Sequence, residues 1–491
     1  MSVSFPLRLH VPGRTGALAT RSGADSTVRR RDLRHLVFPV LAVGAVFQAI
    51  MQTVMVPLLP SMPGFTGAGP TAVSWLVTST LLVGAVMTPI FGRLADMVGK
   101  RRMLLIAFTL MTAGSLICAL TSNIALLIFA RGLQGAGAAV LPIGMAILRE
   151  VLPREKVDRS IAMLSSTLGI GTAVGIPFAA AIVQFADWHL LFWVTTAIGA
   201  GVATAAWIVI PESRTRTGGR FDGVGAVGLS AALICLLVPI TQGSTWGWTS
   251  PAVLTTFAAA VVLFLLWGVQ QLRNRNPLVD LRVSSRPSVL APHLCALLVG
   301  FAFYGNTLIT TQLLQASAEH GAGYGLTILQ AALCQLAASF AMMIFAIVAS
   351  RITERFGAKI TIMAGALFLL GGYCIHAVPG KPLWLVVAAV FVAAVGTSLV
   401  YCTLPVLLLG AVPLSQNAAA NGVNVLLRTV GSTVCSAVVA SVLAAHTVAG
   451  GLGFDTSAFV IAYLVCAGCA VVVFASAFFL PSRRALALVA D

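Results

Sequence analysis

The stretch GRLADMVGKRR, residues 92–102, and the stretch SRITERFGAK, residues 350–359, decide the fold of this 491-residue chain. When Asp96 is aligned with Glu354, four further positions also match at the same offset of 258 residues (354 minus 96). The matching pairs are Arg93 with Arg351, Leu94 with Ile352, Gly99 with Gly357 and Arg101 with Lys359. Each stretch connects two long apolar segments, so the chain carries an internal repeat built around a short basic loop.

The composition places these segments in lipid. The chain is 58% hydrophobic and 9% charged, whereas a soluble domain carries about 25% charged residues. Its apolar runs last about 20 residues without alternating polarity, which is the length of a membrane-spanning helix and unlike a barrel strand. Because every backbone polar group in a bilayer needs an internal partner, we expect an all-α integral membrane protein.

Fourteen apolar segments can be counted along the chain. They lie at about 36–60, 72–91, 103–121, 124–148, 160–185, 190–210, 223–241, 252–271, 288–313, 326–349, 360–378, 382–409, 418–445 and 457–480.

The basic residues fix the direction of these fourteen spans. Of the 30 Lys and Arg residues, Lys381 falls in a loop of one side and Arg131 and Arg428 fall within helices, which leaves 27 on the other side. Cytoplasmic loops are the ones enriched in Lys and Arg. We therefore expect a multi-pass protein of the plasma (inner) membrane with both termini in the cytoplasm. The net charge of +16 then reflects topology, and no nucleic-acid partner is expected.

The repeat offset equals about eight helices of 32 residues, so two six-helix halves are separated by two extra helices. The predicted organisation is a disordered basic cytoplasmic tail at 1–35, an N-terminal six-helix bundle at 36–211, linker segments with two extra transmembrane helices at 212–287, a C-terminal six-helix bundle at 288–480 and a cytoplasmic tail at 481–491. Duplicated halves are typical of secondary transporters, which bind substrate between the repeats and expose it alternately to either side.

Several motifs resemble those of one family. The 92–102 loop is similar to the loop signature of the major facilitator superfamily, and ARGLQGAGAA (130–139) resembles its fourth-helix motif. GIGTAVGIPFAA (169–180), FDGVGAVG (221–228) and LLRTVGSTV (426–434) resemble the fourteen-helix drug:proton antiporter branch. The resemblance implies two six-helix bundles around a central cavity, two additional helices, and export of lipophilic, often cationic, compounds driven by inward proton flow.

Two departures from the family pattern bear on proton coupling. Ile176 separates Gly175 from Pro177 in the fifth-helix motif, and Met51 stands where drug-exporting members usually carry an aspartate. None of the fourteen acidic residues lies deep in a span, although buried carboxylates are the usual proton carriers. Asp96, Glu150, Asp222 and His293 are weak replacements. Proton exchange remains the first hypothesis, and a uniporter or lipid/metabolite carrier without proton coupling is the alternative.

The candidate coupling residues are Arg131, Gln134, Asp96, Arg93, Arg101, Gly175 and Pro177. A lone arginine in a span costs about 2.5–3.5 kcal/mol on insertion scales. Arg131 is therefore either a cavity-facing cation that senses a proton or an anionic group, or a structural residue bonded to neighbouring carbonyls. Gln134 lies three residues further on and so shares its face.

Polar side chains within spans are expected to face the bundle interior or water. The candidates for a substrate cavity are Gln48, Gln52, Tyr304, Asn306, Gln335, Asn424 and Arg428. Together they suit a small lipophilic or amphipathic substrate, and each could instead make an interhelical hydrogen bond. The sequence contains no phosphate-binding loop, no nucleophile–His–acid constellation and no metal-ligand pattern, so we expect neither an enzyme nor a cofactor.

Overall fold

The computed structural model describes residues 34–55, 57–213, 221–274, 277–279, 281–284, 287–316, 323–411, 417–446 and 455–480. The predicted tails at 1–35 and 481–491 lie almost entirely outside these residues. The long helices are α2 (Val37–Thr53), α4 (Pro70–Val98), α5 (Lys100–Leu120), α6 (Ile124–Gly135), α7 (Val140–Val151), α8 (Arg154–Phe185), α9 (Trp188–Val209), α10 (Gly223–Trp246), α11 (Pro251–Arg273), α13 (Pro287–Gln315), α14 (Ile328–Phe356), α15 (Ala358–His376), α16 (Leu383–Ala411), α17 (Asn417–Ala445) and α18 (Thr456–Ala477).

The all-α membrane fold is confirmed, and every described element is helical. Thirteen helices among the described residues are long and apolar enough to cross a membrane. The fourteenth predicted segment, the first in the chain, contains α2, which has 17 residues. It ends earlier than predicted because two prolines follow, and proline lacks the N–H that continues a helix. From Pro57 the chain runs through a 3-10 turn (Leu59–Ser61) into the short helix α3 (Met62–Thr66).

The predicted segment 124–148 is also interrupted. A 3-10 turn, Ala136–Ala139, separates α6 from α7. The turn lies where the chain presses against α4, because a Cβ on Gly135 would come 2.5 Å from the carbonyl oxygen of Thr80. Glycine and alanine therefore bring the two backbones close together, as small residues do at helix interfaces in membranes.

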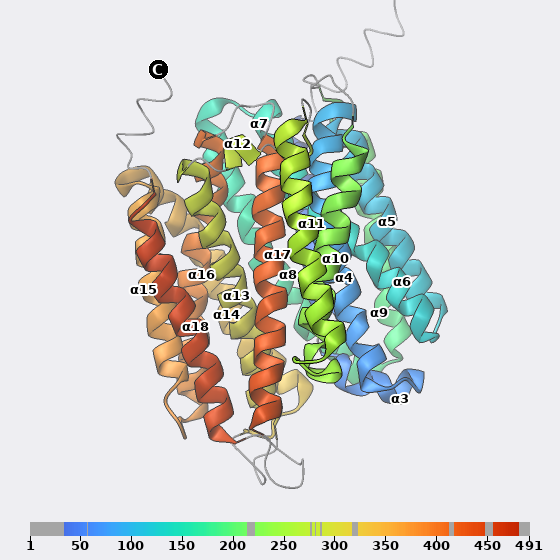
Figure 1. Cartoon of the computed structure of the whole chain (residues 1–491), viewed down its shortest axis with the longest axis vertical. Helices are drawn as coiled ribbons and strands as arrows, with labels where there is room; N and C mark the ends of the chain where they lie inside the picture. Colours follow the sequence, from blue (N-terminus) through green and yellow to red (C-terminus); the bar gives the residue numbers. More distant parts are fainter. Residues whose placement is uncertain are drawn as a thin grey trace, which may run out of the picture.

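The helices form two groups with separate apolar cores. One core joins α2 and α4–α9, and another joins α13 and α15–α18, with α14 packed against α16 beside it. In Figure 1 most of the first group, in blue to cyan, lies on the right, and most of the second group, in yellow to red, lies on the left. They meet where α14 packs against α8 and α17 packs against α4. The six-plus-six arrangement is thus seen in the packing, while the limits of the domains stay a prediction.

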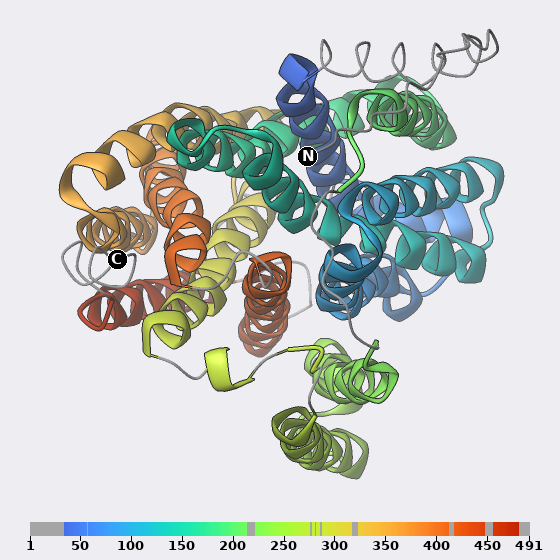
Figure 2. The ribbon, with the colours of Figure 1, turned by 90° about the horizontal axis from the view of Figure 1, so that it is seen from above.

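The two extra helices sit outside both groups. Figure 2 shows α10 and α11 at the edge of the molecule, and α10 packs against α4 and α17. Of the residues of α11, Val253, Ala260 and Gln271 are buried. The pair is therefore an addition to the two-bundle core rather than part of its interior.

The two repeated loops occupy equivalent junctions. Gly99 joins α4 to α5 and Gly357 joins α14 to α15, each as a single residue with a positive φ (126° and 90°). The aligned cations behave alike, since Arg101 donates to the carbonyl of Trp207 and Lys359 donates to that of Phe478. Each cation thus binds near the carboxyl end of the last helix of its own group, where positive charge is favoured.

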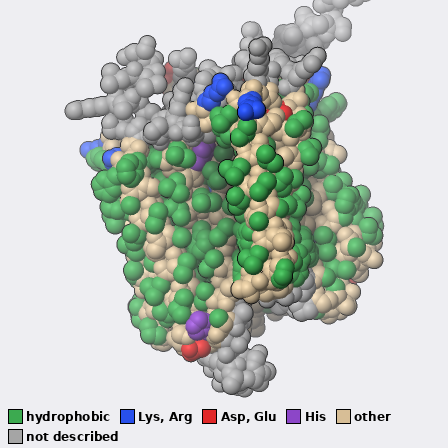
Figure 3. All heavy atoms as spheres, in the orientation of Figure 1, with side chains coloured by type: hydrophobic (Ala, Val, Ile, Leu, Met, Phe, Trp, Pro, Cys, Tyr) green, Lys and Arg blue, Asp and Glu red, His purple; other side chains and the backbone are tan. Residues whose placement is uncertain are grey.

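Apolar side chains cover the flank of the molecule, as a bilayer requires. In Figure 3 the face is largely green, and the blue Lys and Arg side chains gather at one end of it. This end carries the repeated loops, whose basic residues include Arg102 and Arg351. The distribution is that expected of a multi-pass membrane protein with one strongly basic face.

Candidate functional site

A cavity lies between the two groups of helices. It is lined from α2, α4, the 136–139 turn and α7 on one side and from α13, α16 and α17 on the other. Its empty space amounts to about 880 Å³, its open mouth included. The lining residues are Gln48, Gln52, Thr53, Val77, Leu81, Ala138, Leu141, Phe303, Tyr304, Thr307, Tyr401, Val425, Arg428, Thr429 and Ser432.

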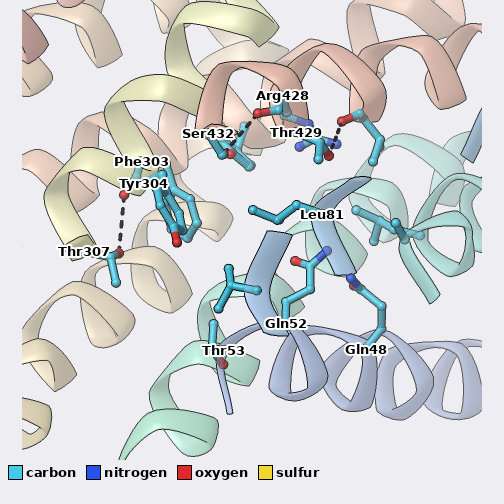
Figure 4. Close-up of a pocket in the computed structure, with 15 residues that line it drawn as sticks. Gln48, Gln52, Thr53, Leu81, Phe303, Tyr304, Thr307, Arg428, Thr429 and Ser432 are labelled. Carbon is cyan, nitrogen blue, oxygen red and sulfur yellow. Dashed lines mark hydrogen bonds between the residues drawn. The ribbon is translucent and has the colours of Figure 1, made fainter. Parts of the chain in front are cut away.

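Four of the seven predicted cavity residues lie here. Gln48 and Gln52, one helical turn apart on α2, point into the space from one wall, and Arg428 and Tyr304 lie across it (Figure 4). Neither glutamine amide has a hydrogen-bond partner within the described part of the chain. Their amide groups are therefore available to a solute.

Arg428 is the charged member of the wall. Its side chain is buried, with 6% of its surface exposed, and its guanidinium lies 4.7 Å from the centre of the Tyr401 ring. A cation over an aromatic face is attracted by the ring quadrupole, worth about 0.5–2 kcal/mol. Among the described residues no carboxylate pairs with Arg428.

The other three predicted cavity residues do not line this space. The amide of Asn306 lies 3.5 Å from the carbonyl of Val390, and Gln335 donates to the carbonyl of Thr307 at 3.1 Å. Asn424 is 1% exposed, and no partner for its amide is found among the described residues. All three are buried within spans, as polar side chains there are expected to be, and Asn306 and Gln335 are directed toward the backbone of a neighbouring helix.

The sequence interpretation missed several members of the wall, chiefly Phe303, Thr307, Tyr401 and Ser432. A helical signal was available for three of them. Thr307 follows the candidate Tyr304 by three residues and Phe303 by one turn, and Ser432 follows the candidate Arg428 by one turn, so these residues share a face with a candidate or with each other. Tyr401 had no such neighbour among the candidates, and its place becomes evident only from the packing of α16 against α13.

Arg131 lies away from the cavity. It is fully buried, and its guanidinium donates to the carbonyls of Leu76 (3.1 Å) and Met51 (3.0 Å) and to the Gln134 side chain. Gln134 in turn donates to Ser115 at 3.1 Å. The expectation of a cavity-facing cation is therefore not met in this conformation. The geometry is that of the alternative, an arginine that ties α6 to α2, α4 and α5.

The 92–102 loop of the first half is held by a buried ion cluster. Lys100 lies 2.5 Å from Glu150 and 3.8 Å from Asp96, while Arg101 lies 3.5 Å from Glu212. Arg93, the other predicted loop residue, is partly exposed. These contacts connect α4, α5, α7 and the end of α9 at one face of the membrane, so this loop positions helices and contributes no residue to the cavity wall.

Gly175 and Pro177 lie on α8 beside the cavity. A Cβ on Gly175 would come 2.8 Å from the Thr53 hydroxyl and 3.2 Å from Cα of Ile50. Pro177 lies inside α8, where it removes one backbone hydrogen bond. The pair therefore permits a close crossing of α8 and α2 next to the cavity residue Thr53.

None of the weak proton-carrier candidates lines the cavity. Asp222 precedes α10 and accepts hydrogen bonds from Gly225, Gln270 and Gln271. Burial by itself would raise its pKa, but these hydrogen bonds outweigh it and hold the pKa below its usual value. His293 is buried in α13, with no ring partner among the described residues. In the described part of the chain no group of side chains could hold a metal ion.

Comparison with known proteins shows which family has this architecture. The family model described as Major Facilitator Superfamily matches residues 41–436. The multidrug resistance protein Stp of Mycobacterium tuberculosis is 30% identical over 84% of this chain and 76% of its own length. The putative multidrug resistance protein MdtD of Salmonella heidelberg is 30% identical over 51% of this chain and 53% of its own.

A solved structure gives independent support for the fold. The crystal structure of the human organic anion transporter MFSD10 superposes with a TM-score of 0.64, at 13% identity, over 90% of this chain and 99% of that one. The family model covers well over half of the chain. The chain therefore belongs to the Major Facilitator Superfamily and is a membrane transporter of that type.

Proposed function

We propose that this chain exports small lipophilic or amphipathic compounds through the cavity between its two groups of helices. The observation that carries the proposal is the composition of the cavity wall, in which both groups contribute aromatic, aliphatic and polar side chains around one space. Such a wall can bind an apolar body and orient a polar end. The names of the two bacterial relatives, both multidrug resistance proteins, favour export as the direction.

Alternating access requires the two groups to rock against each other about this cavity. The contacts that would change are those of α8 with α14 and of α4 with α17. The Arg131 cluster would keep α2, α4, α5 and α6 together as one body during this motion. The other predicted coupling residues would act within that body. Asp96, Arg93 and Arg101 would hold the loop between α4 and α5, and Gly175 and Pro177 would permit the close crossing of α8 and α2.

Proton exchange is the first candidate for the driving force, since the motifs resemble drug:proton antiporters. A carrier without proton coupling is the second candidate. A specific observation favours it: Met51 is buried against Ser115 rather than exposed to the cavity, and the described cavity wall contains no carboxylate. Both candidates use the same cavity, so they differ in energetics rather than in the binding site.

Transport by the purified full chain in proteoliposomes tests the proposal. A panel of amphipathic dyes is followed with an imposed pH gradient and without one. Uptake into vesicles that contain the protein, above that of empty vesicles, is expected. Dependence on the pH gradient selects the antiporter, and equal rates in both conditions select the uncoupled carrier. Equal dye movement in protein-containing and empty vesicles would contradict a transport function.

We further propose that the protein lies in the plasma (inner) membrane with both termini in the cytoplasm, and that it is a carrier rather than an enzyme. The predicted spans place 27 of the 30 Lys and Arg residues on one side, and this supports the topology because cytoplasmic loops are enriched in basic residues. Fluorescent or phosphatase tags fused at each end should report the same, cytoplasmic compartment.

A further inference from the structure

The cavity wall has a single sign of charge. Arg428 is its charged member among the described residues, and no Asp or Glu belongs to the lining. The described carboxylates that form ion pairs lie at Asp96, Glu150, Asp187 and Glu212, in loops or at helix ends. A solute in the cavity would therefore meet a positive potential with no acidic counter-charge beside it.

The guanidinium of Arg428 is also incompletely satisfied. Its described contact is the Tyr401 ring, 4.7 Å away, and no hydrogen bond from its N–H groups to a described residue is found. Arg131 differs, because its guanidinium donates to two carbonyls and to a side-chain amide. An arginine within a span is tolerated when it meets an anion, a carbonyl or water. The N–H groups of Arg428 thus remain available for a ligand.

Among the other polar groups of the wall, the two glutamine amides add free donors. The hydroxyls of Thr53, Thr429 and Ser432 already donate to carbonyls, at 3.1, 2.9 and 3.0 Å. The amides of Gln48 and Gln52 have no described partner and face Arg428 across the space (Figure 4). Free N–H groups on both walls favour a ligand that presents several acceptor oxygens.

From these observations we propose that the transported substrate is an amphipathic organic anion. Its acidic group would bind Arg428, and its apolar body would lie against Phe303, Leu81 and Leu141. The inference rests on the proposed function, because it names the substrate class of the same cavity. It departs from the cationic compounds that the family resemblance implies.

An anionic substrate also changes the energetics of export. A membrane potential of 100 mV, negative inside, contributes about 2.3 kcal/mol per elementary charge, which corresponds to about a forty-fold gradient. The potential itself would therefore drive a monoanion outward. Export would then not require a carboxylate that binds a proton inside the span.

The test uses three solutes with one aryl-alkyl body and different head groups: a sulfonate, a quaternary ammonium and a neutral alcohol. The purified full chain is reconstituted in proteoliposomes, and a potassium diffusion potential is imposed with valinomycin. Saturable sulfonate transport at least ten-fold faster than ammonium transport is expected, with a rate that follows the sign of the potential. Arg428→Gln should reduce sulfonate transport at least ten-fold, and Arg428→Lys should retain part of it.

Arg273→Gln is the matched control, because Arg273 is an exposed arginine at the end of α11 and its loss should leave sulfonate transport unchanged. Thermal unfolding in detergent shows whether each variant is folded. If Arg428→Gln does not fold, the inference is tested by the thermal unfolding of the wild type with each solute. The sulfonate, and not the ammonium, should then raise the Tm of the wild type.

Two results would overturn the inference while leaving the proposed function intact. One is wild-type transport of the ammonium in preference to the sulfonate, and the other is unchanged sulfonate transport by folded Arg428→Gln. Absence of transport for all three solutes would overturn the proposed function and this inference with it.

Discussion

The two halves of this transporter share a scaffold but use their buried charges differently. In the first half, Arg131 donates to two carbonyls and Gln134, and Lys100 pairs with Glu150 and Asp96. In the second half, Arg428 faces the cavity over Tyr401, and Glu354, the counterpart of Asp96, is exposed. The contrast indicates that the acceptors around a membrane-embedded arginine determine what it can do. An arginine whose N–H groups donate to protein acceptors holds helices together, whereas an arginine with free N–H groups is available to bind a ligand.

The largest effect should come from removing the satisfied arginine. Arg131→Met deletes three hydrogen bonds, each worth about 1 kcal/mol between membrane helices, and leaves the buried side-chain oxygen of Gln134 without a donor at a further cost of about 1–3 kcal/mol. We expect a loss of about 4–6 kcal/mol, the sum of those contributions, seen as a Tm drop of several degrees and poor recovery of folded protein. Thermal unfolding in detergent measures it.

Arg428→Gln is the matched variant in the second half. Because the guanidinium there has only the Tyr401 ring as a described partner, its Tm should change much less than that of Arg131→Met. A normal Tm for Arg131→Met combined with lost transport would reverse the assignment and make Arg131 the functional cation.

A smaller effect is expected from the glycines that bring α6 against α4. Gly135→Ala places a Cβ 2.5 Å from the Thr80 oxygen and 3.0 Å from the Gly84 nitrogen, whereas Gly132→Ala meets only the Val83 side chain at 3.5 Å. Overpacking costs about 1–3 kcal/mol. We expect Gly135→Ala to lose that much stability and Gly132→Ala to be neutral or slightly stabilising, as measured by Tm. Equal effects of the two would refute close packing as the reason for the turn.

The smallest effect should distinguish the two loops. Asp96→Asn leaves Lys100 paired with Glu150, so we expect the maximal transport rate to fall a few-fold with an unchanged KM. Glu354→Gln, the exposed counterpart, should leave both constants as in the wild type. Saturation curves in proteoliposomes measure the pair. An increase in KM for Asp96→Asn would mean that the loop acts on substrate binding.

Much of the fold followed from the sequence because lipid imposes simple rules. Span length, the sidedness of basic residues and the repeated loop predicted the helices and the two halves, and the single-glycine junctions at Gly99 and Gly357 match that repeat. The short first helix and the 136–139 turn were not foreseen, because hydropathy does not register a proline stop or a close helix crossing. Both depend on local backbone chemistry.

The site was harder to predict because polarity within a span does not say which way a side chain faces. Gln48 and Asn424 are both buried amides, yet only Gln48 lines the cavity. Arg131 carries a motif, yet its guanidinium donates to the carbonyls of Leu76 and Met51 and does not line the cavity. Tyr401 could not be found at all from spacing, since its role arises from α16 lying beside α13. The direction in which a polar side chain points is set by tertiary packing, which a single sequence does not reveal.

Thiol accessibility tests the central claim, that the cavity between the two halves is the transport path. Gln52→Cys is introduced into an active variant whose native cysteines have been replaced, with Val43→Cys on the exposed side of α2 as the control. A membrane-impermeant thiol reagent is applied from either face of the membrane, with and without a transported solute. We expect the thiol introduced at position 52 to react from both faces and the solute to slow this reaction, whereas the thiol at position 43 should show no such protection. Reaction of the thiol at position 52 at a rate unaffected by a transported solute would contradict the claim.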